Sequence, residues 1–243
     1  MSASARIAEP EPRRIPPAAA EGGRPVLHKY YDSLLAAHGP QGWWPGRTRF
    51  EIIVGAILTQ NTSWTNVELA IRNLRSQKLL SPDAIATLSS ARLASLIRSS
   101  GYFRQKTRTL KAFARFLRYE YHGSLTKMLR TITPVLRQQL LAVHGIGPET
   151  ADSILLYAGK HPVFVVDAYT RRMLARHQLS APQHSYEEIR RLFESSLPPD
   201  VPLYNEFHAL IVRTGKEHCR ASNPRCGECP LHAFLPERTP APL

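Results

Sequence analysis

A single carboxylate, Asp167, follows the short apolar run Val163–Val166 and stands where the sequence predicts the start of a helix. Upstream, Gly145-Ile146-Gly147 joins two helical segments, and glycines on both sides of one apolar residue allow a tight turn. Amides exposed at the N-terminus of a helix form a ready site for a phosphate oxygen. An acid just beyond such a turn would face the sugar of a bound nucleotide and stabilise positive charge there. In the simpler interpretation, the hairpin only binds DNA and Asp167 is a helix N-cap.

The ends of the two hairpin helices are marked by their capping residues. Thr133 and Pro134 suit the N-cap and first turn of the first helix, which should end before Gly145. Pro148 suits the first turn of the second helix, because its missing N–H costs nothing there. Apolar residues at helical spacing give each helix one buried side, with Leu136, Leu140 and Leu141 in the first and Ala151, Ile154, Leu155 and Ala158 in the second.

The charge of the chain indicates a polyanionic partner. Its 243 residues include 32 Lys and Arg against 19 Asp and Glu, which gives a formal net charge of +13. Nucleic acid is the expected partner, since no long apolar segment or amphipathic anchor supports binding to a membrane. The N-terminus is rich in Pro, Arg and Glu and shows no signal peptide. We therefore expect a monomeric cytoplasmic protein, associated with the nucleoid of a prokaryote.

The tryptophans of the chain all lie between residues 43 and 64. Trp43 and Trp44 precede Pro45 in a predicted loop, and Trp64 ends a polar turn. Such positions are poor places for core residues, whereas aromatic rings stack on nucleic-acid bases with about 1–3 kcal/mol each. We therefore interpret these rings as stacking surfaces for a base; the alternative is ordinary core packing.

The rest of the pattern predicts helices and no strand, because Val163–Val166 is too short and lacks a partner. Residues 1–25 show no apolar periodicity and are predicted to be a disordered tail. A long helix is expected from Phe103 to about Tyr121. Cations recur on it at alternating spacings of four and three, which puts them on one face: Arg104, Arg108, Lys111, Arg115 and Arg118. No acids interleave, which favours phosphate contact over a merely solvated face.

The hairpin followed by Val165-Val166-Asp167 resembles the signature of the HhH-GPD DNA glycosylases of the endonuclease III superfamily. This resemblance implies an all-α fold with two lobes and a DNA cleft between them. One lobe would be a six-helix barrel over residues 48–132. The other would combine residues 26–47 with residues 133–218, followed by a cysteine loop and tail over residues 219–243.

Further motifs are similar to the 3-methyladenine DNA glycosylase III subgroup: WWP, ILTQNT, SGYF-RQK, GIG-x-E-T-AD and a late Gly-Lys, together spanning about residues 40–216. The similarity implies a base pocket lined by Trp43, Trp44, Pro45 and Trp64, with Asp167 catalytic and Lys216 near the active site. The alternative for Lys216 is a cation at a helix C-terminus. Other residues are expected to contact DNA or fill the gap left by a flipped base: Gln60, Tyr102, Arg104, Lys106, Gly145, Ile146 and Gly147.

In bifunctional members of the superfamily a lysine on the second hairpin helix attacks the sugar, and Glu149 takes that position here. Glutamate cannot form a Schiff base. We therefore expect a monofunctional DNA N-glycosylase of base excision repair that acts on double-stranded DNA and releases an alkylated purine such as 3-methyladenine. The alternatives are a glycosylase for uracil, mismatched thymine or oxidised pyrimidine, and a non-catalytic, structure-specific DNA-binding protein.

The spacing Cys219-x6-Cys226-x2-Cys229 matches the first ligands of the four-iron four-sulfur loop of endonuclease III, but Leu235 stands where the fourth cysteine would fall. Four ligands are the norm for such a cluster. A zinc site completed by His218 or His232 is one alternative, and a metal-free remnant of the loop is another. Catalysis is expected to require no cofactor.

Overall fold

The computed structural model describes residues 26–44 and 46–236, and within this range it contains helices and no strand. The prediction for residues 1–25, the role assigned to Pro45 and the end of the tail lie outside the described residues. No helix in the described part of the chain combines the length and apolar composition of a membrane span. The α-helices are α1 (Val26–His38), α2 (Arg49–Leu58), α3 (Trp64–Ser76), α4 (Pro82–Thr87), α5 (Ser90–Leu96), α6 (Phe103–Tyr121), α7 (Leu125–Leu129), α8 (Thr133–Ala142), α9 (Pro148–Ser153), α10 (Ala168–Arg176), α11 (Tyr186–Ser196) and α12 (Val201–Glu217). Shorter turns are η1 (Arg98–Ser100), the π-helical η2 (Ile154–Gly159), η3 (Cys226–Glu228) and η4 (His232–Phe234).

Polar side chains start most of these helices, as their sequence positions predict. Ser185 and Glu188 form a reciprocal capping box at α11, and Asp200 accepts from the amide of Leu203 at α12. The expected N-cap of α8 is wrong by one residue. Thr133 is already helical, and its hydroxyl instead bonds Nδ1 of His161 at 2.9 Å.

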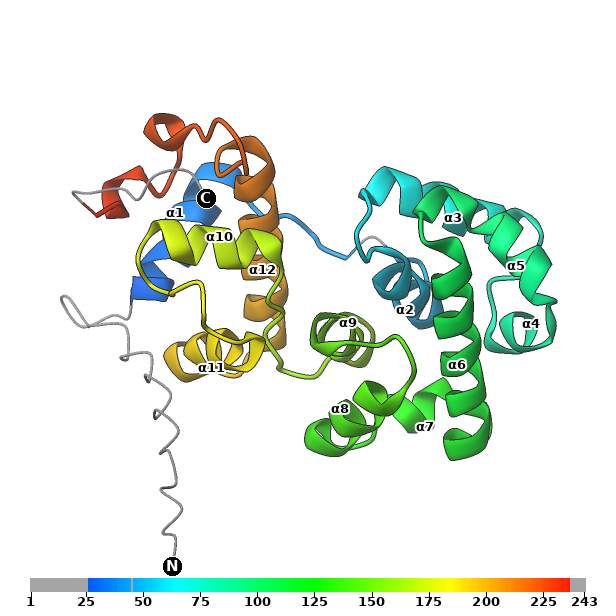
Figure 1. Cartoon of the computed structure of the whole chain (residues 1–243). Helices are drawn as coiled ribbons and strands as arrows, with labels where there is room; N and C mark the ends of the chain where they lie inside the picture. Colours follow the sequence, from blue (N-terminus) through cyan, green and yellow to red (C-terminus); the bar gives the residue numbers. More distant parts are fainter. Residues whose placement is uncertain (1–25, 45, 237–243) are drawn as a thin grey trace, which may run out of the picture.

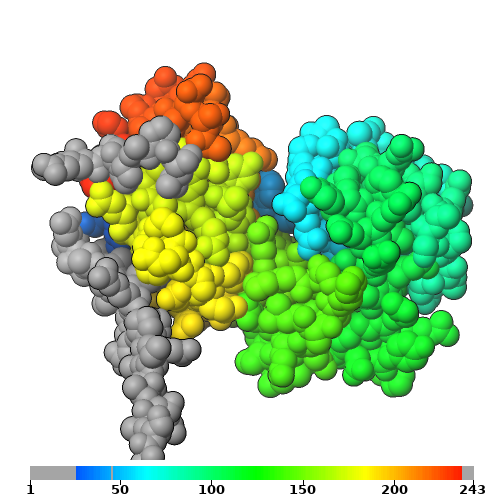
Figure 2. Space-filling model, in the orientation of Figure 1, coloured from blue at the N-terminus to red at the C-terminus, as the bar shows by residue number. Residues whose placement is uncertain are grey.

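Two separate apolar cores divide the described chain into two lobes, which Figure 1 shows side by side. The first core collects side chains from α2 to α9, including Ile53, Ile57 and Phe113. The second is built on α1, α10, α11 and α12 and is rich in aromatic rings, among which Phe164 stacks on Phe193 with 3.8 Å between centroids. Figure 2 shows the surface hollowed between the lobes. The predicted all-α, two-lobed architecture is confirmed.

The apolar side chains of the hairpin belong to the core of the barrel lobe, so the expected boundary at residue 133 is not where the cores divide. Leu136 and Leu140 of α8, together with Ile146 of the turn, belong to the first core. The second core begins with Leu156 and Tyr157 inside η2. Because η2 also packs against α2, this turn is where the lobes are joined.

A partly buried ion-pair network links the hairpin to α11. Arg137 of α8 binds Asp152 of α9 at 2.7 Å and Glu187 of α11 at 2.5 Å. Asp152 has no exposed surface. Removing Arg137 would therefore leave an unpaired charge buried in the protein, which is strongly destabilising. The network therefore fixes the hairpin relative to the second lobe.

Candidate active site

A pocket of about 340 Å³ lies between the lobes and receives side chains from both. Its walls come from the loop before α2, the turn after α2, α9, the start of α10 and α12. The described residues that were predicted to be catalytic or to line the base pocket all meet there together with Gln60, because the lining includes Trp43, Trp44, Gln60, Trp64, Glu149, Asp167 and Lys216. Sequence reasoning had not singled out Tyr169 and His208, which complete the wall around the carboxylates.

Asp167 is both the N-cap of α10 and a pocket wall. Its Oδ1 accepts hydrogen bonds from the amide (2.7 Å) and the hydroxyl (2.9 Å) of Thr170. Its Oδ2 lies 3.5 Å from Nε2 of His208. Burial raises the pKa of Asp167, but His208 and the hydrogen bonds from Thr170 outweigh burial and hold the pKa below its ordinary value. A fixed, ionised carboxylate therefore faces the pocket at neutral pH.

His208 is held in place by a buried tyrosine of η2. The hydroxyl of Tyr157 lies 2.5 Å from Nδ1 of His208. Burial, with Asp167 and Glu149 adding to it, raises the pKa of Tyr157 well above its ordinary value, so the phenol keeps its proton and donates to Nδ1. Because Nδ1 accepts from Tyr157, the ring proton of His208 is on Nε2, the nitrogen that faces Asp167.

Glu149 stands beside Asp167 with a strongly perturbed ionisation. It lies in the first turn of α9 and is open to solvent at the pocket. Partial desolvation by the pocket walls, followed by the negative charge of Asp167, raises the pKa of Glu149 to about 7. The two carboxylates are therefore separated in pKa, with Asp167 ionised and Glu149 titrating near neutrality.

Aromatic rings form the apolar side of the pocket. Trp44 lies edge-on to Trp43 at 5.5 Å and to Trp64 at 5.2 Å, and it tilts against Tyr157 at 4.8 Å between centroids. Gly55 of α2 makes room for them, because a Cβ there would lie 3.3 Å from Trp44 and 3.6 Å from Trp64. These tryptophans are only partly buried and line a cavity.

Lys216 reaches the same aromatic wall from α12. Its Nζ lies 6.0 Å from the centroid of Trp43, within the range of a cation–π contact. Gly215 beside it is packed so closely on Tyr169 that a Cβ would come within 2.3 Å of that ring. The end of α12 is thereby pressed against the start of α10.

The hairpin turn has the backbone that its glycines predict. Gly145 has φ +83°, and a Cβ there would lie 2.0 Å from Oγ1 of Thr109 in α6. Ile146 is buried as the anchor of the turn, and Gly147 precedes the first residue of α9. Among the described residues the amides of Gly145 and Gly147 donate no hydrogen bond, which suits them to a phosphate.

The two residues expected to fill the gap of a flipped base differ in their surroundings. Gln60 lines the pocket, and its amide donates to the carbonyl of Gly145 (3.1 Å) and to Oγ1 of Thr150 (2.8 Å), which ties this turn to the hairpin. Tyr102 is 64% exposed, with φ +43° at the start of α6, and does not line the pocket. Its side chain is free to enter a DNA duplex.

Two expected phosphate contacts are wrong. Lys106 is 3% exposed, and its Nζ donates to the carbonyls of Leu58 (2.9 Å) and Ser100 (2.6 Å), so it closes two turns inside the barrel. Burial lowers its pKa to about 8. Lys111 likewise turns inward and donates to the carbonyl of Leu88 at the end of α4. The cationic face is thus reduced to the exposed Arg104, Arg108, Arg115 and Arg118.

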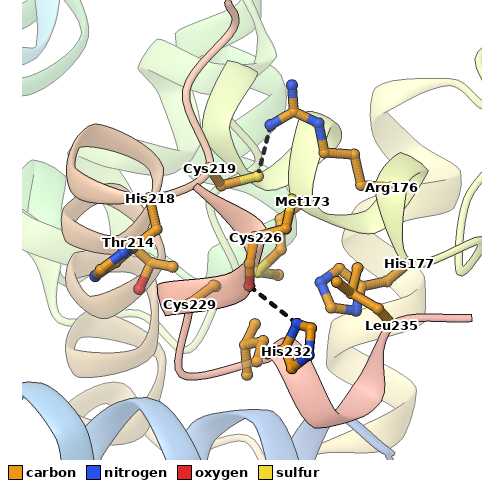
Figure 3. A pocket seen from close by; sticks show the side chains of 11 residues that line it. Met173, Arg176, His177, Thr214, His218, Cys219, Cys226, Cys229, His232 and Leu235 are labelled. Atoms are coloured by element: carbon orange, nitrogen blue, oxygen red, sulfur yellow. Dashed lines mark hydrogen bonds between the residues drawn. The ribbon is translucent and has the colours of Figure 1, made fainter. Parts of the chain in front are cut away.

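The three cysteines line a second, small cavity of about 10 Å³ behind α10 and α12 (Figure 3). Cys219 is buried and accepts a hydrogen bond from Nη1 of Arg176 at 3.1 Å. Arg176 is itself 5% exposed, and a buried guanidinium suits a thiolate partner. Leu235 lines the cavity at the expected fourth position and offers no ligand atom. Nδ1 of His232 donates to the carbonyl of Cys226 (3.1 Å), which leaves its Nε2 free to bind a metal.

The family described as "HhH-GPD superfamily base excision DNA repair protein" matches residues 54–199. The chain belongs to the HhH-GPD superfamily. A candidate DNA repair glycosylase of Methanocaldococcus jannaschii is 45% identical to this HhH-GPD chain over 211 residues, which cover 86% of the chain and 95% of the relative. Endonuclease III of Thermotoga maritima is 28% identical over 74% of this chain and 79% of its own. This HhH-GPD protein is therefore a DNA glycosylase of base excision repair.

Solved structures agree with this assignment. The H. pylori 3-methyladenine DNA glycosylase bound to 1,N6-ethenoadenine matches with a TM-score of 0.66 and 29% identity, over 79% of this chain and 96% of that one. A trapped covalent complex of endonuclease III with DNA matches with a TM-score of 0.75 over 87% of this chain and 95% of that one. At 21% identity, the second similarity shows a common fold alone.

The cysteine loop has a match of its own, because the iron-sulfur binding domain of endonuclease III matches residues 219–234. Cys219, Cys226, Cys229 and His232 all lie within the matched residues, so an iron-sulfur cluster is the group that this comparison supports.

Proposed function

We propose that this HhH-GPD protein is a monofunctional DNA N-glycosylase that flips an alkylated purine, such as 3-methyladenine, out of duplex DNA and releases it by hydrolysis. The observation that carries the proposal is one pocket in which an ionised carboxylate, Asp167, faces a wall of tryptophan rings. Departure of the base builds positive charge on the sugar, and a fixed carboxylate stabilises that charge.

The aromatic wall supports a cationic base as the substrate. Purines alkylated at N3 or N7 carry positive charge, and the faces of Trp43, Trp44 and Trp64 attract cations. A uracil-specific pocket would need hydrogen bonds that reject cytosine. The H. pylori relative, whose solved structure contains 1,N6-ethenoadenine, supports a modified adenine as the class of base.

Glu149 supports hydrolysis without a lyase step. It stands at the position of the superfamily's attacking lysine, and a carboxylate forms no Schiff base. Treatment of the protein with borohydride in the presence of DNA containing an abasic site should therefore trap no covalent adduct. A trapped adduct that disappears in Lys216→Met would overturn the monofunctional assignment and identify the lysine at the pocket wall as nucleophile.

Base release from a panel of otherwise identical duplexes tests the substrate class. Duplexes carrying 3-methyladenine, uracil, mismatched thymine and an oxidised pyrimidine should differ by orders of magnitude in single-turnover rate, with the alkylated purine fastest. Faster release of uracil or thymine would favour the pyrimidine alternative. Binding of all duplexes without any release would favour a non-catalytic DNA-binding protein.

We further propose that Cys219, Cys226 and Cys229 hold a four-iron four-sulfur cluster, with Nε2 of His232 as the fourth ligand. Imidazole replaces thiolate on iron in the two-iron two-sulfur centres of the Rieske type. When bound, the cluster would fasten the loop after α12 and supply no step of base release. Iron and sulfide contents of anaerobically purified protein test this, and His232→Cys should retain the cluster while His232→Ala loses it more readily to chelators. Equal retention in both variants would exclude His232 as a ligand.

A further inference from the structure

Three potential metal ligands meet beside the cysteine cavity, which His218 also lines, where the end of α1 approaches the end of α12. One ligand atom from each of His38, Glu217 and His218 lies within 4.8 Å of the other two. Oε2 of Glu217 is 3.8 Å from Nδ1 of His38 and 3.9 Å from Nε2 of His218. These separations are longer than hydrogen bonds.

The hydrogen bonds around His38 determine which of its nitrogens carries the proton. The hydroxyl of Thr214 donates to the carbonyl of Leu210 (2.8 Å), so it accepts from Nε2–H of His38 (3.1 Å). With its proton on Nε2, the neutral ring of His38 carries a lone pair on Nδ1. The lone pair of Nδ1 then points toward Oε2 of Glu217, which is also an acceptor. Two acceptors that face each other are complemented by a cation between them.

His218 is oriented toward the same oxygen of Glu217. Figure 3 shows its ring nitrogens directed away from the three cysteine side chains, which speaks against His218 as a cluster ligand. Its Nδ1 is buried and has no hydrogen-bond partner among the described residues. The side chain of His38 is 5% exposed and that of His218 is 18% exposed, so two imidazoles are largely withdrawn from water beside one carboxylate.

Arg213 orients the carboxylate of Glu217. Its Nε donates to Oε1 of Glu217 (3.1 Å), and its Nη1 donates to the carbonyl of His38 (2.9 Å). One oxygen of Glu217 is therefore occupied, and Oε2 remains for the histidines. The positive charge of Arg213 lowers the affinity of these three ligands for a cation, but its hydrogen bond holds the carboxylate of Glu217 in position.

We propose that Nδ1 of His38, Nε2 of His218 and Oε2 of Glu217 bind a divalent ion of the zinc type, with a fourth position open to water. Nitrogen and oxygen ligands at about 2.0–2.2 Å around a tetrahedral ion lie about 3.4 Å from one another. Binding therefore requires each imidazole nitrogen to approach Oε2 of Glu217 by about half an ångström, and the two imidazole nitrogens to approach each other by up to about 1.4 Å. The bond from Nε2–H of His38 to Thr214 is the outer contact that usually orients a metal-bound histidine.

The ion would connect two walls of the active-site pocket. His38 is followed by the loop that carries Trp43 and Trp44, and Glu217 is preceded by Lys216. Joining the end of α1 to the end of α12 therefore fixes the distance between the tryptophans and the lysine. This role is independent of the base that the enzyme releases.

Titration of the chelator-treated, full-length protein with Zn²⁺ and Co²⁺ tests the proposal. The wild type should bind one equivalent of Zn²⁺, and 100-fold excess over its Kd should raise Tm by about 5–10 °C. Bound Co²⁺ should show d–d bands without the charge-transfer bands of thiolate ligation, and Cys226→Ser should leave the spectrum unchanged. Glu217→Gln and His38→Gln should bind at least 100-fold more weakly while melting like the wild type in chelator. Glu228→Gln, which alters an exposed carboxylate of the cysteine loop, should bind normally.

Three results would overturn the proposal. One is a wild type that shows no saturable binding. Another is a cobalt spectrum dominated by thiolate bands that Cys226→Ser abolishes. The third is unchanged affinity in both Glu217→Gln and His38→Gln. If one of these variants melts at a lower temperature than the wild type even in chelator, His218→Gln takes its place. Nδ1 of His218 has no hydrogen-bond partner among the described residues, and its Nε2 lies 3.9 Å from Glu217, so this substitution removes no hydrogen bond.

Discussion

Replacing Asp167 by asparagine removes one negative charge from the pocket and keeps the oxygen that caps α10. The amide oxygen of asparagine can still accept from the amide and hydroxyl of Thr170, now at 2.7 and 2.9 Å from Oδ1. Asparagine is as good an N-cap as aspartate. The fold should therefore survive, and the loss should fall on the chemistry.

The size of the loss follows from the electrostatics of the site. Oδ2 of Asp167 lies 3.5 Å from Nε2 of His208, which shows how closely this carboxylate approaches its neighbours. Opposite unit charges about 4 Å apart attract by about 4 kcal/mol at an effective dielectric constant of about 20. Losing that stabilisation from a cationic transition state lowers the rate constant by about 10³-fold.

The rate constant of base release is measured directly as single-turnover release of 3-methyladenine, with enzyme in excess over duplex. The matched control is Asp200→Asn, because Asp200 caps α12 through the same contact, Oδ1 to the amide of Leu203 at 2.7 Å, away from the pocket. The control should keep its rate within twofold. If Asp167→Asn also keeps its rate within tenfold, or melts far below the control, the assignment of Asp167 to transition-state stabilisation is refuted.

Three further predictions concern neighbouring features. The pKa of Glu149 is raised to about 7, so kcat/KM should increase as the pH rises through about 7 and the anion joins Asp167; in Glu149→Gln this inflection should be absent, and its persistence would assign it elsewhere. Gly145→Ala should lower the free energy of unfolding by about 1–2 kcal/mol, because φ is +83° and the new Cβ meets Thr109. Gly147→Ala should cost less in the same urea titration, since φ is −93° and nothing lies within 4 Å of its Cβ. Lys106→Met should lower stability by about 1–3 kcal/mol by leaving buried carbonyls without a donor, yet leave the salt dependence of DNA binding unchanged; a shallower salt dependence would restore Lys106 as a phosphate contact.

Local sequence signals predicted what depends on neighbours in the chain. The start of α9 follows from Pro148, which is its first residue. The turn at Gly145 follows from the freedom of glycine at positive φ. Asp167 stands at the start of α10 because its side chain bonds Thr170 three residues on, a spacing visible in the sequence. These elements required no knowledge of distant contacts.

Side-chain partners far apart in the sequence could not be predicted in this way. Tyr157 and His208 are 51 residues apart, and nothing in the local pattern around either one indicates that they meet behind Asp167. Lys106 belongs by spacing to a basic turn, but its Nζ reaches the carbonyl of Leu58, 48 residues away. Tertiary packing decides whether a lysine faces solvent or donates to a buried backbone carbonyl. The charge pattern alone therefore predicted more DNA-binding cations than the surface presents.

The π-helical turn η2 makes the pocket depend on the number of residues in the chain as well as on their identity. A π turn contains one residue more than an α turn. Deleting Leu155 or Leu156, which precede Tyr157 in this turn, would restore α-helical pitch and rotate everything beyond the deletion by about 100°. Tyr157 would then leave both Trp44 and His208. Relatives with a shorter helix at this point should therefore have lost this aromatic floor, and with it the orientation of the histidine beside Asp167.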